Sequence, residues 1–348
     1  MAANPYSLVF GQPPLEVVER TSQAERIVSE FCQSQPSNTV NLVTGIHGCG
    51  KTGFITRIAG RLKTKKEWIV VNLNPQRDLL AALAAKLCSD KTLAKWFQET
   101  GINLQAFGLG TGIKGAPPIL DIEEALIRML RCIRKHRKRV LITVDEVTNS
   151  RDIRAFAGAY QLFLREQLPV FLLMSGLPHQ IDRLRNADGM TFLERASRTV
   201  LNPLNFTPMV IRFTETLRVS QEAATRLAKA SRGYPFAFQV IGYFCWEYPD
   251  QPEKALDYSR DYLYEFAYHR IWSELSPKDR EVLYAVARSK NGEISRIREI
   301  LEYTSNQFNP YRDRLIKAGV LSAPKSGVVE FALPWFDLFT LDKENEMA

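Results

Sequence analysis

A glycine-rich segment that ends in a lysine and a threonine is the part of this sequence best suited to chemistry. Residues 45–52 match the pattern GxxxxGK[ST] at every fixed position. In such a loop the glycines let backbone N–H groups turn toward a phosphate, and the following helix adds its N-terminal partial positive charge. The residues that would line the phosphates are Gly45, Ile46, His47, Gly48, Cys49, Gly50, Lys51 and Thr52.

Two side chains of this segment have separate expected roles. Lys51 would reach the β- and γ-phosphates of ATP, and the Thr52 hydroxyl would bind Mg²⁺. The alternative is a glycine-rich turn without a ligand. A strand pattern before the segment and a helical pattern after it favour the phosphate-binding loop over that alternative.

A second candidate for chemistry is the acidic end of an apolar run. Residues 140–146 are Val-Leu-Ile-Thr-Val-Asp-Glu. A buried strand would deliver Asp145 at its carboxyl end, where the carboxylate could hold Mg²⁺ through water. Glu146 could take a proton from an attacking water, which is general-base chemistry. Taken by itself, the segment could also be a strand that ends in a capped acidic turn.

The elements that must position these residues follow an alternating pattern over the first two thirds of the chain. Strands are expected at 39–44, 68–73, 140–144 and 170–174, with a fifth at 199–201 or 210–213. Helices are expected at 53–62, at 78–88 and after Asp121, which acts as N-cap with Glu124 at the capping-box position. Strands that alternate with helices predict a parallel sheet covered on both faces. Residues 101–115 contain five glycines and are expected to form a loop or an irregular hairpin.

The remaining third is predicted to be helical up to a final hairpin. Helices are expected at 221–230, 235–246, 252–268 and 294–301, with another that Ser276 and Pro277 begin. A further helix is expected to start at Asn309-Pro310 and to end at Gly319. Apolar segments at 320–321 and 328–333 then indicate a hairpin. Three helices followed by a hairpin are typical of a winged-helix domain.

Length and composition place the chain among globular proteins with more than one domain. It has 348 residues, of which 45% are hydrophobic and 24% charged. Its apolar runs are too short to cross a bilayer, and the first residues do not resemble a signal peptide. The five cysteines are far apart and odd in number, which indicates a reducing compartment and makes the cytoplasm the expected location.

The positive charge is concentrated in one short segment. The formal net charge is +8, and residues 128–139 hold seven Lys or Arg and no acid. These residues could form a solvated helix face whose last cations complement the helix dipole. They could also bind the phosphate backbone of DNA. Residues 270–348 hold twelve Lys or Arg and twelve Asp or Glu. We therefore expect any DNA affinity to come from residues 128–139.

These motifs, in this order, resemble the AAA+ ATPases, and most closely the prokaryotic branch near the origin-recognition ATPases and the STAND signalling NTPases. The resemblance implies further site residues. Arg20 ends a box near the adenine, and Ser175 occupies the sensor position that responds to the γ-phosphate. Arg195 and Arg198 lie where an arginine finger is found, and Pro235 belongs to a lid motif over the base.

The resemblance also implies an architecture and an activity. The expected fold is a five-stranded AAA+-like α/β core at 1–215, a helical lid at 216–269 and a winged helix at 270–348. The expected activity is hydrolysis of ATP to ADP and phosphate with Mg²⁺, coupled to conformational change and self-assembly, and acting on DNA in a replication- or transposition-like role. One alternative is a STAND-type signalling or defence switch whose winged helix contacts protein. Another is an ATP-binding scaffold that barely turns over.

Overall fold

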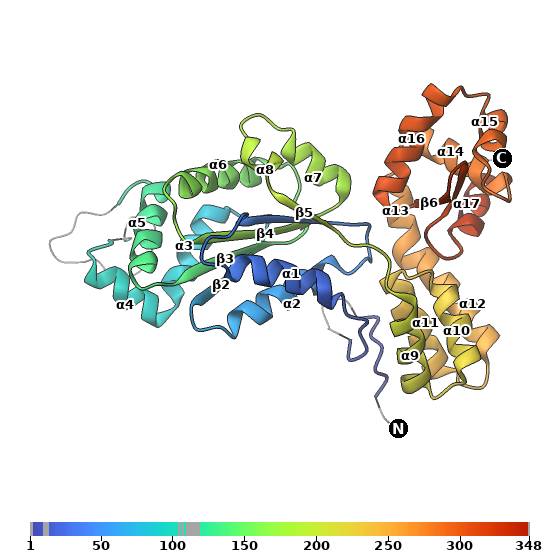
Figure 1. The fold of residues 1–348 in the computed structure, drawn as a ribbon, viewed down its shortest axis with the longest axis horizontal. Coiled ribbons are helices and arrows are strands. Elements are labelled where there is room, and N and C mark those ends of the chain that lie inside the picture. Colours follow the sequence, from blue (N-terminus) through green and yellow to red (C-terminus); the bar gives the residue numbers. More distant parts are fainter. Residues whose placement is uncertain (1–2, 10–13, 104, 106–107, 109–118, 347–348) are drawn as a thin grey trace. The chain divides into compact units, whose positions relative to one another are not determined.

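Figure 1 shows the computed structural model, which describes residues 3–9, 14–103, 105, 108 and 119–346. The chain forms two compact units. One comprises residues 21–44 and 51–200 and is called the sheet unit below. The other comprises residues 1–20, 45–50 and 201–348 and is called the helical unit. No helix among the described residues is long and apolar enough to span a bilayer. The loop expected at 101–115 lies mostly outside the described residues.

The sheet unit is built on five parallel strands. They are β1 (Val40–Thr44), β2 (Trp68–Leu73), β3 (Arg139–Val144), β4 (Val170–Gly176) and β5 (Ser197–Val200). Their order across the sheet is β2-β3-β4-β1-β5. The three central strands are almost continuously apolar and buried, as a sheet covered on both faces requires. The expected parallel sheet is confirmed, and its fifth strand is the first of the two alternatives.

Helices cover both faces of this sheet. They are α1 (Thr21–Cys32), α2 (Lys51–Lys63), α3 (Leu79–Ser89), α4 (Lys91–Glu99), α5 (Ile122–Lys135), α6 (Arg151–Arg165), α7 (Pro178–Arg185) and α8 (Thr191–Glu194). Figure 1 shows α1 and α2 on one face and α6 and α7 on the other. Asp121 caps α5 as expected by accepting from the Glu123 amide. Glu124 instead pairs with Arg128.

The helical unit begins with α9 (Phe206–Leu217), α10 (Gln221–Ser231), α11 (Pro235–Glu247) and α12 (Pro252–Leu263). A π-helical turn (Tyr264–Tyr268) then leads into α13 (His269–Ser273). The possible strand at 210–213 is wrong, because these residues belong to α9. The buried positions of α9 are Met209, Val210 and Phe213, whose spacing is that of a helix face.

The last part of the helical unit has the winged-helix order. It contains α14 (Pro277–Arg288), α15 (Ile294–Leu301), α16 (Ser305–Ala318), the hairpin β6 (Leu321–Lys325) and β7 (Val328–Phe331), and α17 (Phe336–Asn345). The prediction that the third helix starts at Asn309 is wrong. Thr304 and Gln307 form a capping box that starts α16 four residues earlier and leaves Pro310 inside the helix.

Two arginines of α16 are held by carboxylates within the helical unit. Arg312 donates to its neighbour Asp313 at 2.9 and 2.7 Å. Arg314 donates from Nε to Asp279 Oδ1 at 2.9 Å, and Asp279 is also the capping-box partner of Ser276. Asp279 is almost fully buried, whereas Asp313 is exposed. The two pairs therefore differ in how much solvent screens them.

We predict that Arg314→Ala destabilises the α14–α16 region by about 1–3 kcal/mol, because it removes charge-assisted hydrogen bonds from a buried carboxylate. Arg312→Ala is the matched control, since an exposed pair contributes about 0.2–1 kcal/mol. Amide hydrogen exchange of the α14 and α16 peptides measures both effects. Equal loss of protection in the two variants would contradict the role assigned to burial.

Candidate functional site

The best-defined polar site in the sheet unit surrounds the carboxylate of Asp145, just after β3. The Thr52 hydroxyl, from the first turn of α2, donates to Asp145 Oδ2 at 2.5 Å. On the other side, Oδ1 accepts from the hydroxyl of Ser175 on β4 and from the Glu146 amide. Parallel strands β3 and β4 are neighbours, so their carboxyl ends bring these groups together. Donors on both oxygens fix the orientation of the carboxylate.

Glu146 is positioned by an unusual backbone conformation. Its φ is 53°, in the left-handed region that side-chain-bearing residues seldom adopt. The next residue, Val147, donates its amide to the Ser175 carbonyl at 2.8 Å. These contacts hold the turn, and the Glu146 side chain is exposed. Backbone strain maintained by surrounding contacts is a feature of functional sites.

The first turn of α2 places a lysine and the N-terminal amides of the helix in the sheet unit. Lys51 is the first residue of α2 and is only 8% exposed. The first amides of a helix have no partner within it, and its N-terminus carries partial positive charge. Hydroxyl and carboxylate oxygens from Thr52 and Asp145 are ligand types that Mg²⁺ prefers. This donor set therefore fits Mg²⁺ and a phosphate group.

The loop 45–50 is grouped with the helical unit. Gly48 and Gly50 have φ values of +71° and +86°, which favour glycine. A Cβ atom on Gly48 would lie 2.2 Å from the Tyr234 hydroxyl oxygen, so no side chain fits there. The amides of Gly48 and Gly50 make no hydrogen bond to any described residue. Such free donors suit an anion.

His47, inside this loop, is held twice by the helical unit. The Tyr234 hydroxyl donates to the His47 carbonyl at 2.8 Å. His47 Nε2 lies 2.7 Å from Glu274 Oε1, at the end of α13. Burial raises the pKa of Tyr234 well above its ordinary value, so its hydroxyl keeps the proton and remains a donor. We call these two contacts the loop clamp.

Arg20 and Pro235 also lie in the helical unit. The Arg20 guanidinium donates to the Asn202 carbonyl at 3.2 and 2.6 Å, and its Nη1 lies 3.5 Å from where a Gly50 Cβ would be. Burial lowers the pKa of Arg20 from its ordinary value, and an arginine remains charged at neutral pH. Pro235 is the first residue of α11, directly after Tyr234 of the clamp.

Comparisons with known proteins bear on the fold. No curated protein matches the chain. A family model described as "Domain of unknown function (DUF8462)" matches residues 265–340. The Walker-type ATPase of Pyrococcus abyssi matches with a TM-score of 0.63 and 16% identity, over 93% of this chain and 96% of that one. The chain has the fold of a Walker-type ATPase. The α/β fold class expected from the sequence is confirmed.

Two further solved structures are similar over nearly their whole length. Cdc6p from Pyrobaculum aerophilum has a TM-score of 0.49 and 13% identity, with 98% of each chain covered. The ORC2 protein of Aeropyrum pernix has a TM-score of 0.46 and 14% identity, with 97% of each chain covered.

The two candidate finger arginines of this Walker-type fold have different surroundings. Arg198 on β5 pairs with Asp182 of α7 at 3.1 Å, and each side chain is about a quarter exposed (24% and 25%). Arg195 is exposed at the end of α8, and its side chain makes no hydrogen bond or ion pair to any described residue. Arg185 holds the turn before it by donating to the carbonyls of Leu193 and Glu194. Of the two side chains, that of Arg195 is therefore the freer to contact another molecule.

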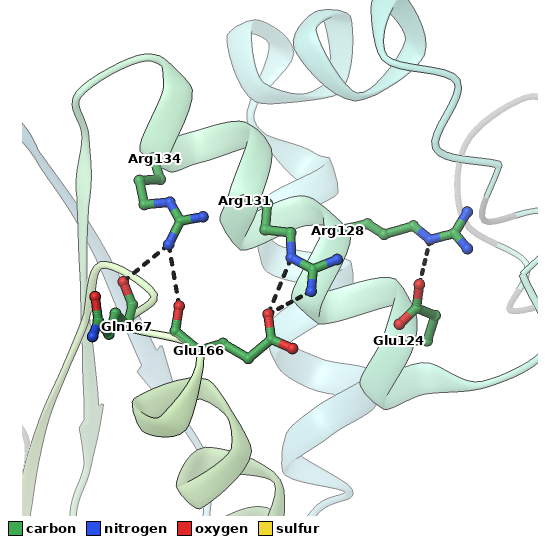
Figure 2. Close-up of polar contacts among 6 residues, drawn as sticks. All are labelled: Glu124, Arg128, Arg131, Arg134, Glu166 and Gln167. Carbon is green, nitrogen blue, oxygen red and sulfur yellow. Dashed lines mark hydrogen bonds and ion pairs between the residues drawn. The ribbon is translucent and has the colours of Figure 1, made fainter.

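Fewer cations of residues 128–139 are free to bind DNA than the composition of this segment suggests. Figure 2 shows Arg128 directed at Glu124 and Arg131 at Glu166, while Arg134 reaches the backbone carbonyls of Glu166 and Gln167. The arginines on the exposed face of α5 are thus engaged within the sheet unit.

Several contacts of the site were not expected from the sequence. No role was predicted for Tyr234, which directly precedes Pro235 of the expected lid motif, and no local pattern marks Glu274. Two buried oxygens, Thr44 Oγ1 and Asn149 Oδ1, have no partner among the described residues. A buried polar atom without a partner requires an explanation, such as an ordered water. Thr44 directly precedes Gly45, and Asn149 follows Glu146 by three residues. This closeness in sequence to predicted site residues is the only feature by which the sequence could have indicated them.

We predict that Tyr234→Phe loosens the 45–50 loop, because it leaves the His47 carbonyl without its hydroxyl donor at a cost of about 1 kcal/mol. Amide exchange in the peptide spanning residues 45–52 should become about five times faster. Tyr264→Phe is the matched control, since the Tyr264 hydroxyl bonds instead to the Trp335 carbonyl. Unchanged exchange in Tyr234→Phe would show that the clamp does not restrain the loop.

Proposed function

We propose that the protein is a MgATP-binding ATPase that works as a conformational switch. The observation that carries this proposal is the Asp145 carboxylate, which is fixed by the Thr52 and Ser175 hydroxyls at the carboxyl end of a Walker-type sheet. A surface acidic turn would not need a donor on each oxygen. The phosphate-binding sequence pattern and the free amides of Gly48 and Gly50 support the same proposal.

In this proposal the chain's own groups bind and orient ATP. The glycine loop donates backbone N–H groups to the phosphates, and Lys51 contributes its positive charge to the β- and γ-phosphates. Thr52 and Asp145 would hold Mg²⁺. When bound, Mg²⁺ neutralises the charge that develops on the transferred phosphoryl group. Arg20 and Pro235 are proposed to border the base.

Glu146 is proposed to act as the general base. Its exposed side chain directly follows the fixed Asp145, where it can accept a proton from the attacking water. Ser175 contacts Asp145 directly, which gives it a positioning role in addition to the sensor role that the resemblance implies. The helices of 216–269 are proposed as the lid and residues 270–348 as the winged helix.

We predict that two substitutions in the site differ in their effect on ATP binding. Lys51→Ala abolishes ATP binding, because it removes the cation that neutralises the phosphates. Glu146→Gln retains ATP but loses turnover by about 10²-fold or more, because only the base is removed. Equilibrium binding of a fluorescent ATP analogue and phosphate release measure the two effects. Turnover by Glu146→Gln at the parent rate would show that Glu146 is not the base.

We also propose self-association, with Arg195 acting on the nucleotide of a neighbouring molecule. Turnover per molecule then rises with protein concentration, since a finger supplied in trans is worth about 10³-fold or more. Arg195→Ala removes this rise without changing stability. Arg198→Ala is the matched comparison and lowers stability by about 1 kcal/mol, because it removes the Arg198–Asp182 ion pair. If turnover per molecule of the parent protein does not change with protein concentration, the proposal is wrong.

Two cellular roles remain as proposals. The first is action on DNA, as a replication- or transposition-like switch. The second is a STAND-type signalling or defence switch, whose winged helix contacts protein or its own ATPase core. The loop clamp favours the second, because His47 of the candidate phosphate-binding loop contacts Glu274, which lies within the proposed winged-helix segment 270–348. DNA-stimulated turnover would favour the first role, and turnover insensitive to DNA would favour the second.

A further inference from the structure

A second charged surface lies at the end of the sheet where strands β2 and β3 begin. Lys63 ends α2, and the loop from there to β2 contains Lys65 and Lys66. Further cations lie at the end of α5, in the short connection that follows, and at the start of β3. We call residues 63–67 and 134–139 together the basic edge. The two segments hold eight Lys or Arg and a single acid, Glu67.

The fold itself brings the two halves of the basic edge together. Strands β2 and β3 are parallel neighbours, with Trp68 paired with Arg139. The Arg139 amide donates to the Glu67 carbonyl at 2.8 Å, and the Lys138 ammonium donates to the Lys66 carbonyl at 2.6 Å. Loops that are far apart in the sequence therefore form one continuous surface.

The cations of the basic edge keep their charge uncompensated. Three of them bond only to neutral carbonyls: Arg134 to Glu166 and Gln167, Lys138 to Lys66, and Arg139 to Phe31 and Gln33. The other five are exposed, and their side chains make no ion pair or hydrogen bond to any described residue. These five are Lys63, Lys65, Lys66, Lys135 and Arg137.

This arrangement differs from that of the neighbouring arginines on α5. Arg128 and Arg131 are neutralised by Glu124 and Glu166, as Figure 2 shows. A concentration of like charge lowers stability by self-repulsion unless an anion binds it. The arginines in the middle of α5 are therefore compensated by carboxylates, whereas the cations of the basic edge are not.

An exposed aromatic ring lies within the same surface. His136 stacks on Trp96 with ring centroids 3.7 Å apart and planes 4° apart, and it lies between Lys135 and Arg137 in sequence. A flat exposed ring between cations can stack on a nucleic-acid base. The carboxylate side chains of an acidic polypeptide have no flat ring that could stack on it. The surface therefore favours a nucleic acid over an acidic polypeptide.

We propose that the basic edge binds the phosphate backbone of DNA without reading its sequence. This inference rests on the DNA-directed form of the proposed function and names the surface responsible. The basic edge adjoins the end of α2 at Lys63, whereas Lys51 of the candidate phosphate site begins that helix. A helix of 13 residues is about 20 Å long. DNA binding and ATP binding can therefore be measured separately.

The test compares two variants of the full chain that lose the same charge. In the edge variant, Lys65→Gln, Lys66→Gln, Lys135→Gln and Arg137→Gln remove four unpaired cations. In the control variant, Arg128→Gln, Arg131→Gln, Lys278→Gln and Arg296→Gln remove four cations that are each paired with an acid. Binding to a labelled 30-base-pair duplex, to its single strand and to polyglutamate is measured between about 50 and 200 mM NaCl, where phosphate contacts show their salt dependence.

We expect the parent and control variants to bind DNA with the same steep salt dependence. The edge variant should bind at least about tenfold more weakly at 50 mM NaCl, and its logarithmic salt slope should be smaller by about 3–4, close to 0.9 per lost phosphate contact. Equal weakening in both variants, loss only in the control, no DNA binding by the parent protein, or parent binding to polyglutamate as tight as to DNA would overturn the proposal.

Phosphate release without DNA is measured on the same preparations. The edge variant should hydrolyse ATP at the parent rate within about twofold, because the edge lies at the opposite end of α2 from Lys51. Edge-dependent DNA binding in a protein that does not hydrolyse ATP would reject the ATPase proposal alone. ATP hydrolysis by a protein whose DNA binding is unaffected by the edge variant would reject the further inference alone.

Discussion

The contact on which the candidate site depends is the hydrogen bond between the Thr52 hydroxyl and the Asp145 carboxylate. It joins the first turn of α2 to the end of β3, and the Ser175 hydroxyl on β4 holds the opposite oxygen. A carboxylate bonded on both sides has little freedom to turn, so its position is set before any ligand arrives. The left-handed backbone at Glu146 follows from the same arrangement, because the chain must turn immediately after the fixed residue.

The direction of the parallel strands accounts for the separation between the site around Asp145 and the basic edge. Asp145 and Ser175 lie at the carboxyl ends of their strands, and the basic edge lies at the amino ends of β2 and β3. Ligand sites of parallel α/β sheets are generally found at the carboxyl ends. The amino ends are then free to carry a different surface, and here residues 63–67 and 134–139 make it strongly basic.

Local sequence signals located much of the fold. The strands at 68–73 and 140–144 were predicted almost to the residue, because buried parallel strands are continuous apolar runs. Failures came where two signals competed. At 210–213 the apolar run resembled a strand but formed one face of α9, and at α16 the Thr304 capping box outweighed Pro310. Long-range partners such as Glu274 for His47 leave no local pattern, because they depend on how distant segments pack.

The most direct test of the account is titration of the full chain with ATP in the presence of Mg²⁺ or of EDTA, for the parent protein and for Asp145→Asn. The account predicts that Mg²⁺ strengthens ATP binding by the parent protein, and that Asp145→Asn loses about 10- to 100-fold of this enhancement, the range expected for a residue that orients a metal's ligands. Affinity that is independent of Mg²⁺ in the parent protein, or full retention of the enhancement in Asp145→Asn, would contradict it.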